Sequence, residues 1–151
     1  MPALLLSLPD LAATAALGSR LAAALRPGDA VLLEGPLGAG KSALARAILR
    51  SLLHDEALTV PSPTFTLVQT YDAPIGTIAH FDLWRLDGPS PELEPQVLEL
   101  GWDEAREGVV LVEWPDRLGA LTPADALRVR LDYAGEAARS AELEGWAERL
   151  A

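Results

Sequence analysis

The sequence predicts a three-layer α/β domain over residues 1–151, with a mostly parallel central sheet, helices on both faces and antiparallel additions. Three observations predict this class. The length suits one hydrophobic core, and half of the residues are hydrophobic. A buried strand at 30–34 leads through a glycine-rich turn into an amphipathic helix at 42–53. A second apolar run, Val109–Val112, is the most strand-like segment of the chain.

Composition excludes several functional classes. The chain has 22 acidic and 12 basic residues and a net charge of −10, so it should repel phosphate backbones and not bind nucleic acid by itself. It has no cysteine, which excludes disulfides, thiolate metal sites and cysteine nucleophiles. The apolar stretch Ala3–Leu8 is too short for a signal peptide, and no window reaches the ~20 apolar residues of a membrane span. We therefore expect a cytoplasmic protein without membrane contact.

The glycine-rich turn fits the phosphate-loop pattern G-x-x-x-x-G-K-[S/T]. Glycines let backbone N–H groups approach phosphates, and the following helix adds its partial positive charge. Lys41, the only lysine of the chain, would reach the β- and γ-phosphates, and the Ser42 hydroxyl would bind Mg²⁺. These features predict a P-loop NTPase fold that binds ATP and Mg²⁺. The expected nucleotide contacts are Gly35, Gly38, Ala39, Gly40, Lys41, Ser42 and Ala43.

Two carboxylates follow predicted strands. Glu113 follows the run at 109–112, and Asp82 follows a strand at 76–81. The carboxyl ends of parallel strands face the ligand crevice, so both side chains should lie near the phosphate loop. We expect Glu113 to bind Mg²⁺ directly, while Asp82 holds it through water or orients the attacking water. The neighbouring His80 is typical of a histidine packed within a strand.

The remaining elements add antiparallel strands. Residues 64–71 alternate and turn back toward the strand at 76–81 as a hairpin. Residues 127–131 alternate strictly and predict a strand with one solvated face. Residues 141–150 are ambiguous, because their apolar positions suit either a final strand or a helix.

Four motifs in this order resemble the TsaE family, also called YjeE, of bacterial ATPases in tRNA threonylcarbamoyladenosine biosynthesis. They are Gly35–Ser42, Ser62–Val68, His80–Leu86 and Leu111–Pro115. The resemblance spans about residues 9–133 and implies a small P-loop ATPase that works with TsaB and TsaD, which transfer threonylcarbamoyl to tRNA. It also implies that tRNA is contacted only indirectly.

The resemblance assigns roles to several positions. The family's switch near the γ-phosphate falls on Ser62–Thr64, so Thr64 joins Asp82 and Lys41 as a candidate catalytic residue. The family's magnesium ligands match Ser42 and Glu113.

The resemblance further implies an adenine site. The segment at the start of the first helix lies near the adenine in the family, which places Leu11 and Thr14 there.

The chain departs from the family pattern at three places. Ser42 replaces the usual threonine but keeps the metal-binding oxygen, and Trp84 replaces a common tyrosine. Pro91 and Pro95 fall where the family has a continuous helix, so we expect that helix to be shortened or restarted.

Two other functions remain open. A small-molecule kinase is the alternative, because the glycine spacing of the loop also suits kinases, although the arginines that a kinase lid needs are scattered here. A nucleotide-gated binding module, in which ATP orders residues 59–70 without fast hydrolysis, is a further possibility.

Overall fold

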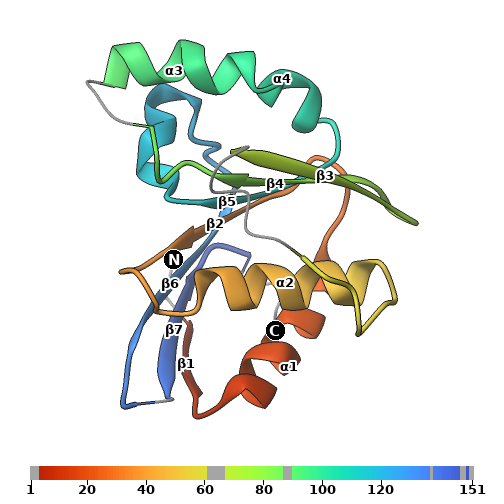
Figure 1. Cartoon of the computed structure of the whole chain (residues 1–151), viewed down its shortest axis with the longest axis vertical. Coiled ribbons are helices and arrows are strands. Elements are labelled where there is room, and N and C mark those ends of the chain that lie inside the picture. The colour runs from red at the N-terminus through yellow and green to blue at the C-terminus, as the bar shows by residue number, and fades with distance from the viewer. Residues whose placement is uncertain (1–3, 61–66, 87–89, 137, 147–148, 150–151) are drawn as a thin grey trace.

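The computed structural model of the chain describes residues 4–60, 67–86, 90–136, 138–146 and 149 (Figure 1). Within these residues, no helix has the length and hydropathy needed to cross a bilayer. In chain order the elements are β1 (Leu4–Leu8), α1 (Leu11–Ala24), β2 (Ala30–Glu34), α2 (Lys41–Leu52), β3 (Val68–Ala73), β4 (Gly76–Asp82), α3 (Ser90–Glu99), α4 (Trp102–Ala105), β5 (Val109–Glu113), the 3₁₀ helix η1 (Pro115–Leu121), β6 (Leu127–Tyr133) and β7 (Arg139–Glu144).

The strands form one mixed sheet of seven strands in the order β1-β7-β6-β2-β5-β4-β3. β6, β2, β5 and β4 pair in parallel at its centre, whereas β1, β7 and β3 pair antiparallel at its two sides. The predicted parallel centre and antiparallel additions are therefore both present, and the additions account for three of the six strand pairings. Short connections explain the β3–β4 and β6–β7 pairs, because strands joined without a crossover can pair only antiparallel, whereas β1 and β7 are far apart in the sequence.

The antiparallel strands at the β1 side of the sheet settle whether the segment 141–150 forms a strand or a helix. The segment 141–150 contributes to β7, which begins earlier, at Arg139, and pairs with β6 as a hairpin. β1, which the sequence analysis did not identify, pairs with the other edge of β7 and aligns Leu6 with Ala141.

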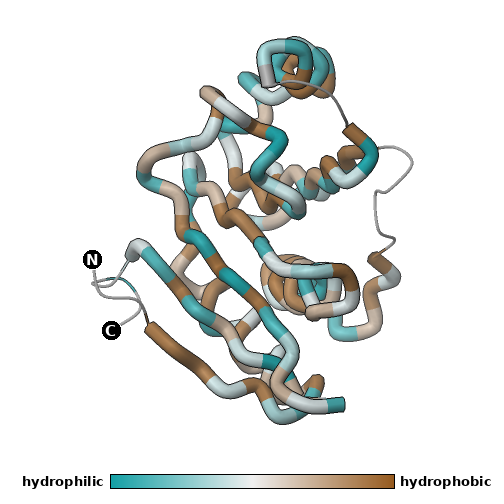
Figure 2. The backbone as a smooth tube through the Cα atoms, turned by 90° about the vertical axis from the view of Figure 1, so that its left-hand side faces the viewer, coloured by the Kyte–Doolittle hydropathy of each residue, from teal (hydrophilic) through white to brown (hydrophobic). Residues whose placement is uncertain are grey.

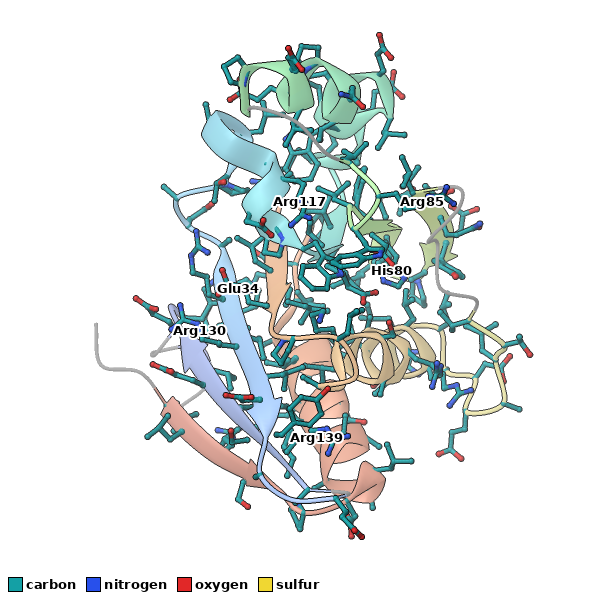
Figure 3. The ribbon with its side chains drawn as sticks, turned by 60° about the vertical axis from the view of Figure 1, so that its left-hand side comes forward. Glu34, His80, Arg85, Arg117, Arg130 and Arg139 are labelled. Carbon is teal, nitrogen blue, oxygen red and sulfur yellow. The ribbon has the colours of Figure 1, made fainter. Side chains whose placement is uncertain are left out.

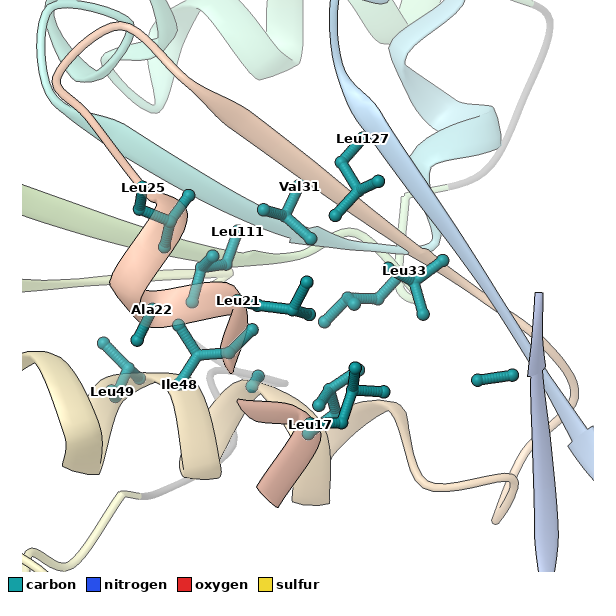
Figure 4. Close-up of a cluster of buried hydrophobic side chains, with 14 of the residues drawn as sticks. Leu17, Leu21, Ala22, Leu25, Val31, Leu33, Ile48, Leu49, Leu111 and Leu127 are labelled. Carbon is teal, nitrogen blue, oxygen red and sulfur yellow. The ribbon is translucent and has the colours of Figure 1, made fainter. Parts of the chain in front are cut away.

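Helices cover both faces of the sheet, which is why its central strands are buried on both sides. Val31 and Leu33 of β2 join a core with α1 and α2, and Figure 4 shows this cluster. Ala30 and Leu32 point to the opposite face and join a second core with α3, α4 and η1. The sequence prediction of helices on both faces is confirmed.

β6 has the alternation expected of a strand with one solvated face. Leu127, Val129 and Leu131 are buried in the α1–α2 core, while Arg128 and Arg130 on the other face are partly exposed. Figure 2 shows alternating hydrophobic and hydrophilic residues along the strands on this side.

α3 shows where the expected helix interruption falls. The helix begins at Ser90, passes through Pro95 and ends at Glu99. The prolines therefore do not restart it, and the break comes at Gly101, whose φ of 90° precedes α4. Pro91 is tolerated in the first turn, and Pro95 removes one N–H donor from a helix of only 10 residues.

Candidate nucleotide-binding site

The loop between β2 and α2 places two polar side chains at a helix N-terminus. β2 is buried along its length and ends at Glu34, and α2 begins at Lys41. Gly38 and Gly40 have φ values of 78° and 104°, a left-handed conformation that favours glycine. The sequence prediction of strand, glycine-rich turn and helix is confirmed, although α2 starts one residue earlier than predicted.

Lys41 is the charged centre of this loop and is only 5% exposed. Its ammonium donates to the carbonyl oxygens of Gly35 at 2.5 Å and Pro36 at 2.8 Å. It also lies 4.2 Å from the ring centre of Trp114, a cation–π contact. Burial lowers the pKa of Lys41 below its usual value, while the negative charge of Glu113 acts in the opposite direction.

The two acidic strand ends lie side by side, as predicted. Asp82 of β4 pairs in register with Glu113 of β5, and the two residues are 5% and 2% exposed. The Ser42 hydroxyl donates to Glu113 Oε1 at 2.8 Å, which joins the start of α2 to the end of β5. The structure thus brings together the two residues predicted to bind magnesium.

His80 has a contact that its sequence position did not reveal. It is 1% exposed within β4, as expected for a packed strand histidine. Its Nε2 lies 2.6 Å from Glu113 Oε2, so the carboxylate is held by His80 on one oxygen and by Ser42 on the other. The signal in the sequence is its spacing: His80 precedes Asp82 by two residues, so both side chains point to the same face of β4.

Two tryptophans and an arginine border the site, and the sequence analysis gave them no role at the site. The rings of Trp84 and Trp114 lie 4.5 Å apart. The Arg117 guanidinium carbon is 5.5 Å from the Trp114 ring centre and 5.9 Å from that of Trp84. The backbone N–H of Trp84 donates to Asp82 Oδ1 at 3.1 Å. The contacts of Trp84 with Trp114 and Arg117 join two segments that are distant in sequence, so no local pattern could have predicted them.

A pocket of about 370 Å³ collects most of the predicted residues. It is lined by Leu37, Gly38, Gly40, Lys41, Ser42, Ala43, Asp82, Trp84, Glu113 and Trp114. Two predicted contacts, Gly35 and Ala39, do not line it. The carbonyl of Gly35 holds Lys41 instead, and the Ala39 side chain is fully buried in the core.

Three predicted residues remain, and the structure places two of them elsewhere. Leu11 and Thr14 line a larger pocket of about 680 Å³ between α1 and α2, and Ala43 lines both pockets. Thr64 lies outside the described residues.

The fold and the site define an α/β protein with a phosphate-loop motif whose lysine and hydroxyl face two acidic strand ends. Residues 8–141 match the family model described as threonylcarbamoyl adenosine biosynthesis protein TsaE. The chain belongs to this family, which confirms the resemblance inferred from its motifs. Members of the family take part in tRNA threonylcarbamoyladenosine biosynthesis.

Curated relatives carry the name tRNA threonylcarbamoyladenosine biosynthesis protein TsaE. The protein of Rickettsia conorii is 40% identical over 79% of this chain and 65% of its own length. The protein of Streptomyces coelicolor is 37% identical over 89% of this chain and 92% of its own length. Among solved structures, Bacillus subtilis YdiB superposes with a TM-score of 0.75 and 26% identity, covering 99% of this chain and 89% of that one.

Proposed function

We propose that this chain is a magnesium-dependent P-loop ATPase that serves tRNA threonylcarbamoyladenosine formation together with TsaB and TsaD. The observation that carries the proposal is the meeting of Lys41, Ser42, Asp82 and Glu113 in one pocket at the start of α2. A cation, a hydroxyl and two carboxylates at a helix N-terminus are the groups that binding and cleavage of a magnesium-bound triphosphate need. Membership of the TsaE family supports the pathway.

Lys41 binds the phosphates in this proposal. Its ammonium exchanges the carbonyls of Gly35 and Pro36 for phosphate oxygens, which carry more negative charge. The N–H groups at the start of α2 are directed toward the same anion, because the first turn of a helix leaves them without intrahelical partners.

Ser42 and Glu113 fit a magnesium ion. Both are oxygen donors, they already lie within hydrogen-bond distance, and Mg²⁺ in nucleotide sites takes one or two protein ligands and keeps several waters. When bound, the ion neutralises charge on the phosphates. His80 fixes the orientation of the Glu113 carboxylate by holding its second oxygen.

Asp82 orients the attacking water in this proposal. It ends β4, the strand that pairs with β5, and lies in register with Glu113. It lines the same pocket. Its Oδ1 accepts from the backbone of Trp84, which fixes the carboxylate relative to the sheet. Thr64 stays a predicted contributor.

The pocket between α1 and α2 suits the nucleoside part. Leu11 and Thr14 line it, and Ala43 lines both this pocket and the phosphate pocket. A nucleotide whose phosphates lie at Lys41 therefore has a route past Ala43 to the predicted adenine site.

Calorimetry and turnover test the proposal together. We expect the chain to bind ATP in the presence of magnesium, to release inorganic phosphate slowly when alone, and to do so faster when TsaB and TsaD are added. Absence of ATP binding with magnesium present would refute the ATPase. A hydrolysis rate that does not change when TsaB and TsaD are added would refute the partnership. Transfer of labelled phosphate to a metabolite would favour the alternative function, a small-molecule kinase.

A further inference from the structure

The hairpin of β6 and β7 borders the outer side of the phosphate loop. Tyr133 ends β6 and Arg139 begins β7, and the two residues form a cross-strand pair. The Arg139 guanidinium carbon lies 5.0 Å from the Tyr133 ring centre, a cation–π contact, and Figure 3 shows Arg139 at this end of the strands. Both residues lie outside the four motifs identified in the sequence.

This pair holds two consecutive carbonyls of the loop. The Tyr133 hydroxyl donates to the carbonyl of Leu37, and Arg139 Nη2 donates to the carbonyl of Gly38 at 3.1 Å. In a trans peptide the C=O and the following N–H point in opposite directions. The Leu37 carbonyl held by the hairpin therefore turns the N–H of Gly38 away from it, toward the inside of the loop, while the N–H of Ala39 is occupied by the carbonyl of Pro36.

The Arg139 side chain is itself fixed. Its Nη1 donates to the carbonyl of Ala138 at 2.8 Å and to that of Glu136 at 3.3 Å, both within the hairpin connection. On the loop side, the N–H of Ala39 donates to the carbonyl of Pro36 at 3.1 Å and closes the turn. The hairpin and the loop thus form one hydrogen-bonded unit.

The glycines of the loop allow this close approach. A Cβ on Gly35 would lie 2.3 Å from the Leu131 carbonyl oxygen of β6, and a Cβ on Gly38 would lie 2.9 Å from the Tyr133 hydroxyl. A side chain at either position would push the loop away from the hairpin. These glycines therefore serve the contact with the hairpin as well as the approach of phosphates.

We propose that Tyr133 and Arg139 are positioning residues for the phosphate loop: by holding the carbonyls of Leu37 and Gly38, they fix the loop in the conformation that presents the N–H of Gly38 to an anion. The inference rests on the proposed nucleotide function. A loop held in its binding conformation loses less conformational freedom when a ligand binds, so the pair raises affinity without touching the ligand.

The test uses two variants and one control of the full chain. Tyr133→Phe keeps the ring but removes the hydroxyl, and Arg139→Ala removes the guanidinium. Arg130→Gln is the control, because Arg130 lies on the same strand β6 and pairs with the carboxylates of Glu34, which precedes the loop, and Glu142, and not with the loop carbonyls that Tyr133 and Arg139 hold. Figure 3 shows Arg130 beside Glu34.

We expect each variant to bind ATP with magnesium about three- to tenfold more weakly than the parent, as loss of its one hydrogen bond to the loop predicts. Without nucleotide, hydrogen exchange at residues 35–42 should be faster in both variants than in the parent. The midpoint of unfolding should shift no more in the two variants than in the Arg130→Gln control. Parental affinity in both variants would overturn the proposal, as would unchanged exchange. No ATP binding by the parent would refute the nucleotide function instead, and the exchange data would still decide whether the hairpin orders the loop.

Discussion

At the scale of single residues, Lys41 illustrates how a binding site prepares for its ligand. Its ammonium is buried with two backbone carbonyls and the face of Trp114 around it. Binding of a phosphate therefore exchanges neutral acceptors for charged ones, and only the difference contributes to affinity. In the proposed function the same argument applies to Glu113, because a cation would compete with Ser42 and His80 for the oxygens that they now hold.

Lys41→Ala should weaken ATP binding by about 1.5–3 kcal/mol, the usual value of a charge-assisted hydrogen bond. Calorimetry with ATP and magnesium measures this, and Arg130→Gln serves as the surface-charge control. Parental affinity in the alanine variant would contradict the assigned role of Lys41.

The lowered pKa of Lys41 predicts a pH dependence. The folded protein loses this proton below the usual lysine pKa of about 10.4, and phosphate charge restores it. ATP affinity should therefore fall as the pH rises from neutral through the lowered pKa, with proton uptake on binding. For folding the sign is opposite: burial of the charged amine destabilises the protein below the lowered pKa, and this penalty disappears as the pH rises toward the unfolded value. Calorimetry in two buffers of different ionisation enthalpy measures the proton uptake, which Lys41→Ala should abolish.

Glu113→Gln and Asp82→Asn should separate the proposed binding of magnesium from the proposed orientation of the attacking water. Glu113→Gln removes the charge that holds magnesium, so the difference in ATP affinity with and without the ion should shrink. Asp82→Asn should leave ATP bound but slow turnover by about 10²-fold or more, as loss of a positioned carboxylate predicts. If magnesium titrations of Glu113→Gln matched the parent, Asp82 would become the preferred metal ligand.

At the scale of elements, the packing of α1 on α2 determines the shape of the pocket assigned to the nucleoside. The helices touch at Gly18, where a Cβ would lie 2.5 Å from the Cβ of Ala47 and 3.0 Å from its backbone carbon. Leu17 and Leu21 of α1 and Ile48 of α2 pack around this contact in the same core (Figure 4). The close approach therefore depends on the missing side chain.

Gly18→Ala should destabilise the protein although alanine favours helix by about 1 kcal/mol. The added methyl meets backbone, so an overpacking cost of about 1–3 kcal/mol should exceed that gain. Denaturant unfolding measures the change. Adding Ala47→Gly removes the nearest atom and should recover part of the loss, with Ala47→Gly alone as the control. A Gly18→Ala protein more stable than the parent would contradict this expectation, because it would show that α1 and α2 can move apart to admit the methyl group at little cost.

Much of this element structure could be predicted from sequence, and the failures have physical causes. Residues 35–42 and the acidic ends Asp82 and Glu113 were predictable, because a loop motif is local and parallel strands end at one edge of a sheet. The hairpin contact of Tyr133 with Leu37 was not, since it joins residues about a hundred positions apart without any local pattern. α3 passing through Pro95 was missed because tertiary packing overrides propensity.

At the scale of the whole molecule, the mixed sheet separates two regions. The parallel strands β4 and β5 carry the acidic side chains of the site, and the antiparallel hairpin of β6 and β7 supports the loop from outside. Partly exposed basic side chains on that side are paired: Arg128 contacts Glu34 at 2.8 Å, and Arg130 lies 3.4 Å from the same carboxylate. The net charge of −10 is therefore not offset by a free basic surface on these strands.

We expect the isolated chain not to retard tRNA in a gel at physiological salt, because binding to phosphate backbones needs clustered cations. Any contact with tRNA should require the proposed partners. A salt-dependent shift by the chain alone would contradict this expectation.

The solitary lysine has a practical consequence for chemical labelling. Lys41 is the sole side-chain amine of the chain and lies in the loop with 5% of its surface exposed. Its lowered pKa enlarges the unprotonated fraction that an acylating reagent attacks at mildly alkaline pH. Covalent modification of that peptide, read by mass spectrometry, would then report directly whether the loop is occupied, since bound phosphate would both shield and protonate the amine.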